Sequence, residues 1–112
     1  MSIKCDEYNQ VCVIALIGDF VGEDSLAVRK HIDELIDQRQ IVDYVLDIEK
    51  SGFLDSDGLE TLVWIRKRCE DLFGQIKLAN LDENCKKILE ITRLAHRFEC
   101  CPDLPGALKT MR

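Results

Sequence analysis

The sequence predicts an α/β protein with a mixed, mostly parallel sheet, an antiparallel hairpin at its edge and about four helices. Short apolar runs alternate with segments of helical periodicity, which is typical of parallel strands joined by helices. Two apolar runs near the start are separated only by Asn9 and Gln10, a connection too short for a crossover, so they indicate a hairpin. The length of 112 residues suits one domain, and we expect residues 1–112 to form it.

The first half of the chain contains the hairpin, one helix and one central strand. Residues 3–8 and 11–17 are the hairpin strands, and the second is apolar enough to be covered on both faces. Residues 18–22 break the run, residues 23–38 form the first helix, and residues 41–48 form the next strand. The apolar stripe of the helix is Val28, Ile32, Leu35 and Ile36.

The second half repeats the alternation of helix and strand. Residues 57–73 are the second helix, with Gly74 as its C-terminal stop, and residues 76–80 are a strand. Asp82 is the expected N-cap of a third helix. The stripe of this helix is Cys85, Ile88, Leu89 and Thr92.

The chain closes with a short strand at residues 97–100 and a helix capped by Asp103. Pro105 lies in the first turn of that helix, where its missing N–H is harmless. The stripe of this helix is Leu104, Ala107, Leu108 and Met111. Strands separated by helices are expected to be parallel, through right-handed crossovers, and helices must cover at least one face of the sheet.

Charge and hydropathy narrow the classes of partner. The net charge is −6, from 15 basic and 21 acidic residues, which argues against nucleic acid and anionic membranes and is compatible with a basic protein partner. No apolar run approaches the roughly 20 residues of a membrane span. The start, Met1 to Cys5, runs into acidic residues and does not resemble a signal peptide, so we expect a cytoplasmic protein.

The six cysteines are expected to be reduced thiols without a metal or cofactor. Cys12, Cys69 and Cys85 fall at apolar positions, there is no C-x-x-C pair, and no histidine stands at metal-ligand spacing from a cysteine pair. A small enzyme or thiol redox protein remains an alternative, which would depend on Cys100 or Cys101. His31 and His96 have no partner at a motif spacing, so we expect both to be ordinary, partly exposed residues.

The most informative segment is residues 44–59. A buried strand ends at Asp47-Ile48, a loop follows, and a helix begins around Ser56 and Asp57. Partner and ligand sites of open α/β sheets lie at such carboxyl ends of strands. This segment resembles the signature of STAS domains, in which a V-L-D-L strand leads through a loop with a large apolar residue to D-S-[ST]-G-L. The matching pieces are Val45-Leu46-Asp47-Ile48, Phe53-Leu54 and Asp55-Ser56-Asp57-Gly58-Leu59.

The resemblance extends over nearly the whole chain, through residues 17–20, 78–81, 88–94 and 103–108. It implies a STAS-like fold and the function of an anti-sigma-factor antagonist, which is not an enzyme. In that family the serine after the aspartate is phosphorylated by a partner that is both a kinase and an anti-sigma factor, and Ser56 matches it. The unphosphorylated form binds this partner and frees a sigma factor. Phosphorylation ends the binding, and a metal-dependent serine phosphatase restores the unphosphorylated form.

Several residues around Ser56 have more than one interpretation. Ser56 or Asp57 could serve only as an N-cap, and Asp57 with Glu60 resembles a capping box. Gly58 leaves the first turn bare, so a partner's backbone could approach closely. Asp57 stands where the family has Ser or Thr. It could mimic the modified state, change which kinase accepts the site, or mark a non-switching scaffold or transporter-accessory module.

The expected partner surface is formed by the loop from Ser51 to Asp57 and the outer face of the second helix. Its residues are Asp55, Ser56, Asp57, Gly58, Glu60 and Trp64. Trp64 falls in line with charged residues and almost opposite the apolar stripe of this helix. That position predicts a binding hot spot, with a single exposed apolar residue as the alternative. The stripe itself is Leu59, Leu62, Val63, Cys69 and Phe73.

Overall fold

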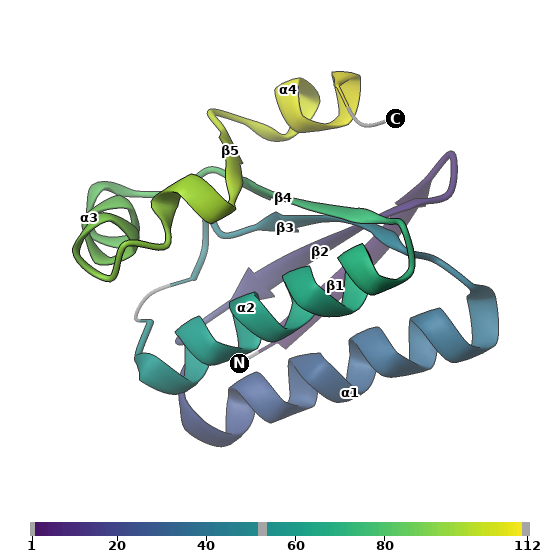
Figure 1. Ribbon diagram of the computed structural model, residues 1–112, viewed down its shortest axis with the longest axis horizontal. Helices are drawn as coiled ribbons and strands as arrows, with labels where there is room; N and C mark the ends of the chain where they lie inside the picture. Colours follow the sequence, from purple (N-terminus) through teal and green to yellow (C-terminus); the bar gives the residue numbers. More distant parts are fainter. Residues whose placement is uncertain (1, 52–53, 111–112) are drawn as a thin grey trace.

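Five strands form one mixed sheet in the computed structural model, which describes residues 2–51 and 54–110 (Figure 1). The strands are β1 (Ser2–Tyr8), β2 (Val11–Ile17), β3 (Asp43–Asp47), β4 (Gln75–Ala79) and β5 (Glu99–Cys101). They lie side by side in chain order. β1 pairs with β2 antiparallel and all other neighbours are parallel, so the predicted mixed sheet with its edge hairpin is confirmed.

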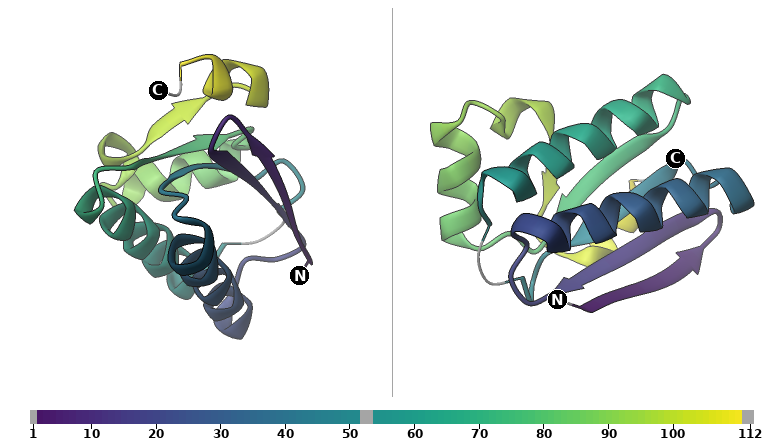
Figure 2. Two further views of the ribbon diagram at one scale, coloured as in Figure 1. Left: turned by 90° about the vertical axis from the view of Figure 1, so that its right-hand side faces the viewer. Right: turned by 90° about the horizontal axis from the view of Figure 1, so that it is seen from below.

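Helices cover both faces of this sheet. They are α1 (Gly22–Arg39), α2 (Ser56–Asp71), α3 (Glu83–Ile91) and α4 (Leu104–Lys109), with a 3-10 turn, η1, at Ala95–Arg97. α1 and α2 lie next to each other on one face, and α4 lies on the other (Figures 1 and 2). No helix in the described part of the chain is long and apolar enough to cross a membrane.

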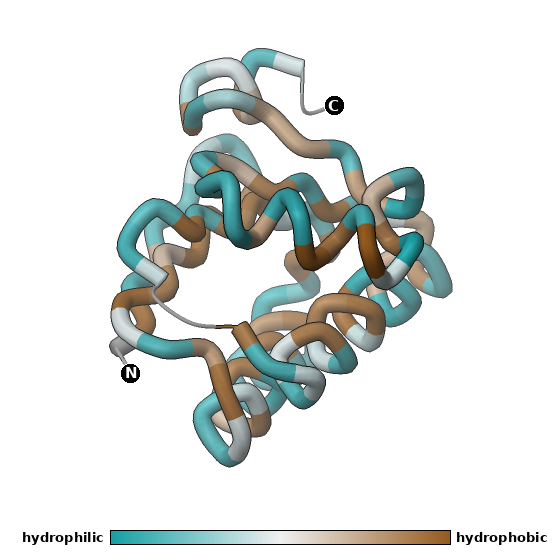
Figure 3. Tube along the Cα trace, turned by 90° about the vertical axis from the view of Figure 1, so that its left-hand side faces the viewer, coloured by the Kyte–Doolittle hydropathy of each residue, from teal (hydrophilic) through white to brown (hydrophobic). Residues whose placement is uncertain are grey.

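The two faces carry different cores because side chains alternate along each strand. Tyr44 and Leu46 of β3 belong to the larger core beneath α1, α2 and α3, whereas Val45 between them belongs to a smaller core beneath α4. Along the helices, hydrophobic and hydrophilic residues also alternate, with the periodicity of an amphipathic helix (Figure 3). The central strands are mostly apolar because both of their faces are covered.

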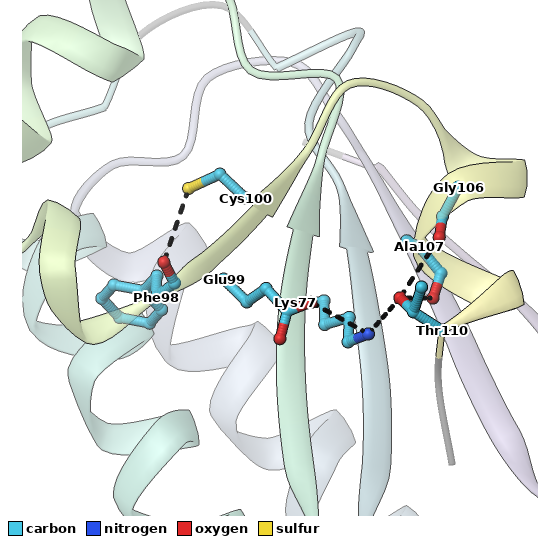
Figure 4. Close-up of polar contacts among 7 residues, drawn as sticks. All are labelled: Lys77, Phe98, Glu99, Cys100, Gly106, Ala107 and Thr110. Atoms are coloured by element: carbon cyan, nitrogen blue, oxygen red, sulfur yellow. Dashed lines mark hydrogen bonds and ion pairs between the residues drawn. The ribbon is translucent and has the colours of Figure 1, made fainter.

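A buried lysine lies on the α4 side of the sheet. Lys77 of β4 is only 2% exposed. Its neighbours Ile76 and Leu78 face the larger core, so the Lys77 side chain lies on the opposite face of the sheet. Its Nζ lies 3.1 Å from Oε2 of Glu99 and donates a hydrogen bond to Oγ1 of Thr110 just after α4 (Figure 4). The ammonium group therefore links β4, β5 and the end of α4.

The second helix ends differently from the prediction. α2 stops at Asp71, and Phe73 rather than Gly74 adopts the left-handed conformation, with φ of 64°. The amides of Phe73 and Gly74 donate to the carbonyls of Glu70 and Cys69, which is a Schellman motif. Phe73, predicted to lie in the apolar stripe, is 99% exposed, since this turn carries it away from the core. Gly74 is needed for packing, because a Cβ there would lie 1.9 Å from the Val42 carbonyl oxygen.

Other predictions differ by a few residues. β3 begins at Asp43 rather than residue 41, and β5 begins at Glu99 because η1 occupies the preceding residues. Asp82 and Asp103 cap α3 and α4 as predicted. All six cysteines are free thiols, and Cys12, Cys69 and Cys85 are buried as expected. Phe53 and Met111, to which the sequence assigned a loop and a stripe position, lie outside the described residues.

Candidate functional site

The candidate site lies where β2 and β3 end and α1 and α2 begin. The loops after the two strands touch through a parallel bridge between Phe20 and Leu54, and both side chains are buried. The N-terminal ends of α1 and α2 therefore emerge next to each other at one end of the molecule (Figures 1 and 2). This is the edge where parallel strands place their carboxyl ends, as the sequence predicted.

Asp55 holds both helix N-termini. Its Oδ1 accepts a hydrogen bond from the Gly58 amide at 2.9 Å, which makes Asp55 the N-cap of α2. Its Oδ2 accepts from the Gly22 amide at 3.2 Å, at the first residue of α1. α1 has no side-chain cap of its own, since its N-cap residue is Val21. One carboxylate, in the loop after β3, therefore binds the first turns of two helices that follow two different strands.

This arrangement corrects the predicted caps. Neither Ser56 nor Asp57 is the N-cap, because α2 already begins at Ser56 and Asp55 occupies the capping position. The proposed capping box between Asp57 and Glu60 is therefore wrong. Ser56, Asp57 and Glu60 are all exposed, so the hydroxyl and both carboxylates face outward. Their negative charges lie in the first turns of α2, where the helix dipole favours anions.

Gly58 does not open the surface to a partner. It is buried, and a Cβ added to it would lie 2.3 Å from the backbone oxygen of Phe20 and 2.6 Å from Cδ1 of Leu54. The bare Cα thus faces inward, against the loop that follows β2. Glycine is needed here because α2 and that loop pack at backbone distance.

Trp64 is also placed differently from the prediction. It is half-buried and packs against the larger core, because α1 lies along the flank of α2 that the helical periodicity had assigned to solvent. Cζ of Arg29 from α1 lies 5.5 Å from the centroid of the indole ring, and Nε of Arg29 donates to Oγ1 of Thr61 at 2.9 Å. Trp64 therefore takes part in the α1–α2 contact and presents only part of its surface to a partner.

A groove of about 350 Å³ runs between the first turns of α1 and α2. Its lining combines acidic residues of both helices with one arginine and one exposed leucine: Gly22, Glu23, Ser25, Leu26, Arg29, Asp57 and Glu60. Leu26 is 56% exposed. The groove continues the exposed face that carries Asp57 and Glu60, so it extends the candidate partner surface from α2 onto α1.

Sequence reasoning missed this contribution of α1. Gly22, Leu26 and Arg29 lie more than 20 positions from the nearest residue of the predicted surface. Leu26 gave one signal, since it falls outside the apolar stripe of its helix. The spacing of apolar residues along the sequence does not predict that α1 contacts α2.

The loop after β3 is fixed by Asp47 at the strand end. Its Oδ1 accepts from the Glu49 amide at 3.1 Å and from Nδ2 of Asn80 at 3.0 Å. Asn80, just after β4, has a left-handed φ of 61°. The aspartate of the V-L-D-I segment is thus a structural residue that joins the ends of β3 and β4. In the described part of the chain, no three His, Cys, Asp or Glu residues converge as metal ligands would.

Comparisons with known proteins agree with this architecture. A family model for the STAS domain matches residues 2–107. The chain is 24% identical over 94 residues to an anti-sigma F factor antagonist of Paenibacillus polymyxa, which covers 84% of this chain and 80% of that relative.

Solved structures share the fold at low sequence identity. SpoIIAA, a Bacillus cell fate determinant solved in its phosphorylated form, superposes with a TM-score of 0.78 at 19% identity and covers 99% of this chain and 100% of its own. An anti-sigma factor antagonist of Mycobacterium paratuberculosis gives a TM-score of 0.86 at 20% identity, over 99% of this chain and 93% of its own.

Proposed function

The chain belongs to the STAS domain family, and we propose that it is an anti-sigma-factor antagonist, a binding protein rather than an enzyme, switched by phosphorylation of Ser56. In this proposal the unphosphorylated protein binds a cytoplasmic anti-sigma factor that is also a serine kinase, and so frees a sigma factor. A metal-dependent serine phosphatase reverses the modification. The similarity to an anti-sigma F factor antagonist supports the partner class.

The observation that carries the proposal is the exposure of Ser56 on a rigid helix end. Of the serines whose side chains the structure describes, Ser25 and Ser51 are buried, and Ser56 alone is exposed. Asp55 caps α2 and ties it to α1, so the Ser56 backbone is held without using the Ser56 hydroxyl. The hydroxyl is left available to a kinase.

The proposed switch follows from the charge that phosphorylation adds. The Ser56 oxygen attacks the γ-phosphorus of ATP held by the kinase, the bond to ADP breaks, and the hydroxyl proton passes to a base of the kinase. The phosphate adds about −1.5 to −2 charges at pH 7 to a surface that already carries Asp57 and Glu60. The free protein tolerates this anion at a helix N-terminus, whereas a partner packed over it would have to desolvate it.

The proposed binding surface comprises Asp55, Ser56, Asp57, Glu60, the exposed part of Trp64 and the groove shared with α1. Its acidic residues favour a basic partner surface, and Leu26 offers an apolar contact. Gly58 contributes by setting the position of α2, because it is buried.

Intact-mass spectrometry tests the proposal on protein purified from its own cells with phosphatases inhibited. We expect the wild type to carry one phosphate and Ser56→Ala to carry none. Thr92→Ala, which removes another exposed hydroxyl at the end of α3, is the matched control and should keep the phosphate. A wild type without phosphate across growth and stress conditions would refute the switch.

Asp57 favours a second candidate function, a STAS scaffold or transporter-accessory module that does not switch. Its carboxylate is exposed directly beside Ser56 and gives the site a fixed negative charge. Asp57→Ser restores the family pattern and separates the two functions. If only Asp57→Ser becomes phosphorylated in the cell, the natural protein is the non-switching module. If the wild type is phosphorylated as well, the switch stands.

A further inference from the structure

A cysteine and a histidine that are 26 positions apart in the sequence meet beside the edge strand. Sγ of Cys5 in β1 lies 2.8 Å from Nε2 of His31 in α1, within hydrogen-bonding distance. Cys5 is exposed, so a small molecule can reach its sulfur. This pair joins the hairpin to the middle of α1 and plays no part in the proposed switch.

A second thiol supports the same sulfur from inside the protein. Cys12 of β2 is 2% exposed and lies beside Cys5 across the hairpin. The hairpin register explains this, because Cys5 pairs with Ile14 and Cys12 pairs with Glu7, so the two cysteines are diagonal neighbours on one face. Two groups from two elements therefore converge on one exposed sulfur.

The surroundings of Cys5 favour its thiolate. The hydrogen bond with Cys12 and then the His31 contact lower its pKa to about 6, against burial and the negative charge of Asp6 on the same strand. The same interaction raises the pKa of Cys12, which keeps its proton. Glu7 of β1 lies on the same face of the hairpin and forms an ion pair with Arg39 of α1, and these two opposite charges act on the pKa of Cys12 in opposite directions. Tyr44 of β3 also lies near this pair; burial raises its pKa, so it is a neutral phenol that donates to the Ile41 carbonyl.

Other cysteines of the chain show the opposite behaviour. Burial raises the pKa of Cys69 to about 12 and that of Cys85 to about 11, and it also raises the pKa of the exposed Cys100. Cys5 thus differs from another exposed thiol in the same molecule. Cys100 can therefore serve as an internal control.

We propose that Cys5 is a nucleophilic modification site that hydroperoxides oxidise, with His31 and Cys12 as the residues that position and stabilise its thiolate. The sulfur of Cys5 attacks one oxygen of hydrogen peroxide, a sulfur–oxygen bond forms, and the oxygen–oxygen bond breaks. The hydrogen of the attacked oxygen stays on it as the sulfenic O–H, and the leaving hydroxide takes a proton from an acid of the buffer to form water. Sulfur is oxidised to a sulfenic acid and the peroxide is reduced to water.

The expected contrast with Cys100 follows from ionisation and nucleophilicity. At pH 6 about half of the Cys5 thiol is ionised, against about 0.1% for a reference thiol with the unshifted pKa of 9.0. The intrinsic nucleophilicity of a thiolate falls about 25-fold over three units of pKa. Because the pKa of Cys100 is raised above this ordinary value, Cys5 should be alkylated at least about 20 times faster than Cys100 at pH 6.

The test is the alkylation of the folded protein by iodoacetamide between pH 5 and pH 10, read for each cysteine by peptide mass spectrometry. We expect the Cys5 rate to rise with a midpoint near pH 6 in the wild type. His31→Leu and Cys12→Ala should each move this midpoint to higher pH. Cys12→Ser keeps a hydroxyl that can still donate, so its midpoint should stay close to that of the wild type. Circular dichroism identifies variants that have lost the fold.

Peroxide then tests the chemistry directly. With hydrogen peroxide at pH 7 and dimedone as the trapping agent for sulfenic acid, Cys5 should be labelled before Cys100 in the wild type, and more slowly in His31→Leu. A Cys5 midpoint near the ordinary thiol value of about 8.5 would overturn the proposal. Equal labelling of Cys5 and Cys100 by dimedone would also overturn it.

Discussion

Removing the Asp55 carboxylate tests whether one side chain stabilises the start of two helices. In Asp55→Ala, α2 loses its N-cap, a change that typically costs about 1 kcal/mol. The Gly22 amide at the start of α1 also loses its acceptor, and a hydrogen bond to a charged group contributes about 1.5 kcal/mol or more. The free energy of unfolding should therefore fall by about 2.5 kcal/mol, and the protein should remain folded at 25 °C.

Two variants separate the two contributions. Asp55→Asn offers one oxygen to two N–H donors, so it should lose one bond and about half of the total. Asp82→Ala is the matched control, because Asp82 caps α3 through one bond to the Cys85 amide at 2.8 Å and, among residues 2–51 and 54–110, accepts from no amide of a second helix. It should cost about 1 kcal/mol.

Urea unfolding followed by far-ultraviolet circular dichroism gives these free energies, with an unchanged m-value as the sign that the unfolded states are comparable. The reasoning is refuted if Asp55→Ala costs no more than Asp82→Ala. In that case the bond to Gly22 contributes nothing, and the two helix ends are held together by packing alone.

Three further changes have defined outcomes. Gly58→Ala should lower the free energy of unfolding by about 3 kcal/mol in the same urea assay, because the new Cβ meets the Phe20 carbonyl oxygen at 2.3 Å. Lys77→Ala should lower it by about 2 kcal/mol and speed hydrogen exchange in α4, since the buried stem and the contact with Glu99 are both lost. From about pH 6 to pH 9 the stability of the wild type should rise relative to Cys5→Ser, because the folded protein has the lower thiol pKa and the unfolded state binds more protons.

Each of these changes has a control or a contrary result. Gly106→Ala, whose nearest neighbour is a side-chain oxygen at 3.0 Å, should cost less than Gly58→Ala. Lys77→Met keeps the apolar stem, so α4 should retain most of its protection against hydrogen exchange. If Lys77→Met and Lys77→Ala lose the same amount of protection, the effect comes from the ammonium group. A stability difference between wild type and Cys5→Ser that is constant with pH would contradict a lowered thiol pKa in the folded state.

The order of elements could be predicted from the sequence because each element is encoded locally. The apolar runs at residues 11–17 and 41–48, and the caps at Asp82 and Asp103, depend on neighbours a few positions away. Helix ends were less predictable. At Phe73 the Schellman turn forms through backbone hydrogen bonds, so an aromatic residue takes the conformation expected of the glycine that follows it.

Contacts between elements were the part that local patterns did not contain. The periodicity of α2 assigned Trp64 to solvent because it identifies only one buried face, whereas α1 covers a second flank. The proximity of Cys5 to His31 depends on the hairpin register and on how α1 lies across it. No spacing rule brings together residues 26 positions apart.

The structure divides the D-S-D-G-L segment into residues that build the site and residues that a partner can reach. Asp55 caps two helices and Gly58 lets α2 pack against the loop after β2, so both set the position of the helix end. Ser56 and Asp57 are the exposed residues of this segment. A change at Asp55 or Gly58 should therefore act through stability and through the position of Ser56, whereas a change at Ser56 or Asp57 should alter charge and leave the fold intact. Comparing binding with urea stability across these four positions separates the two groups.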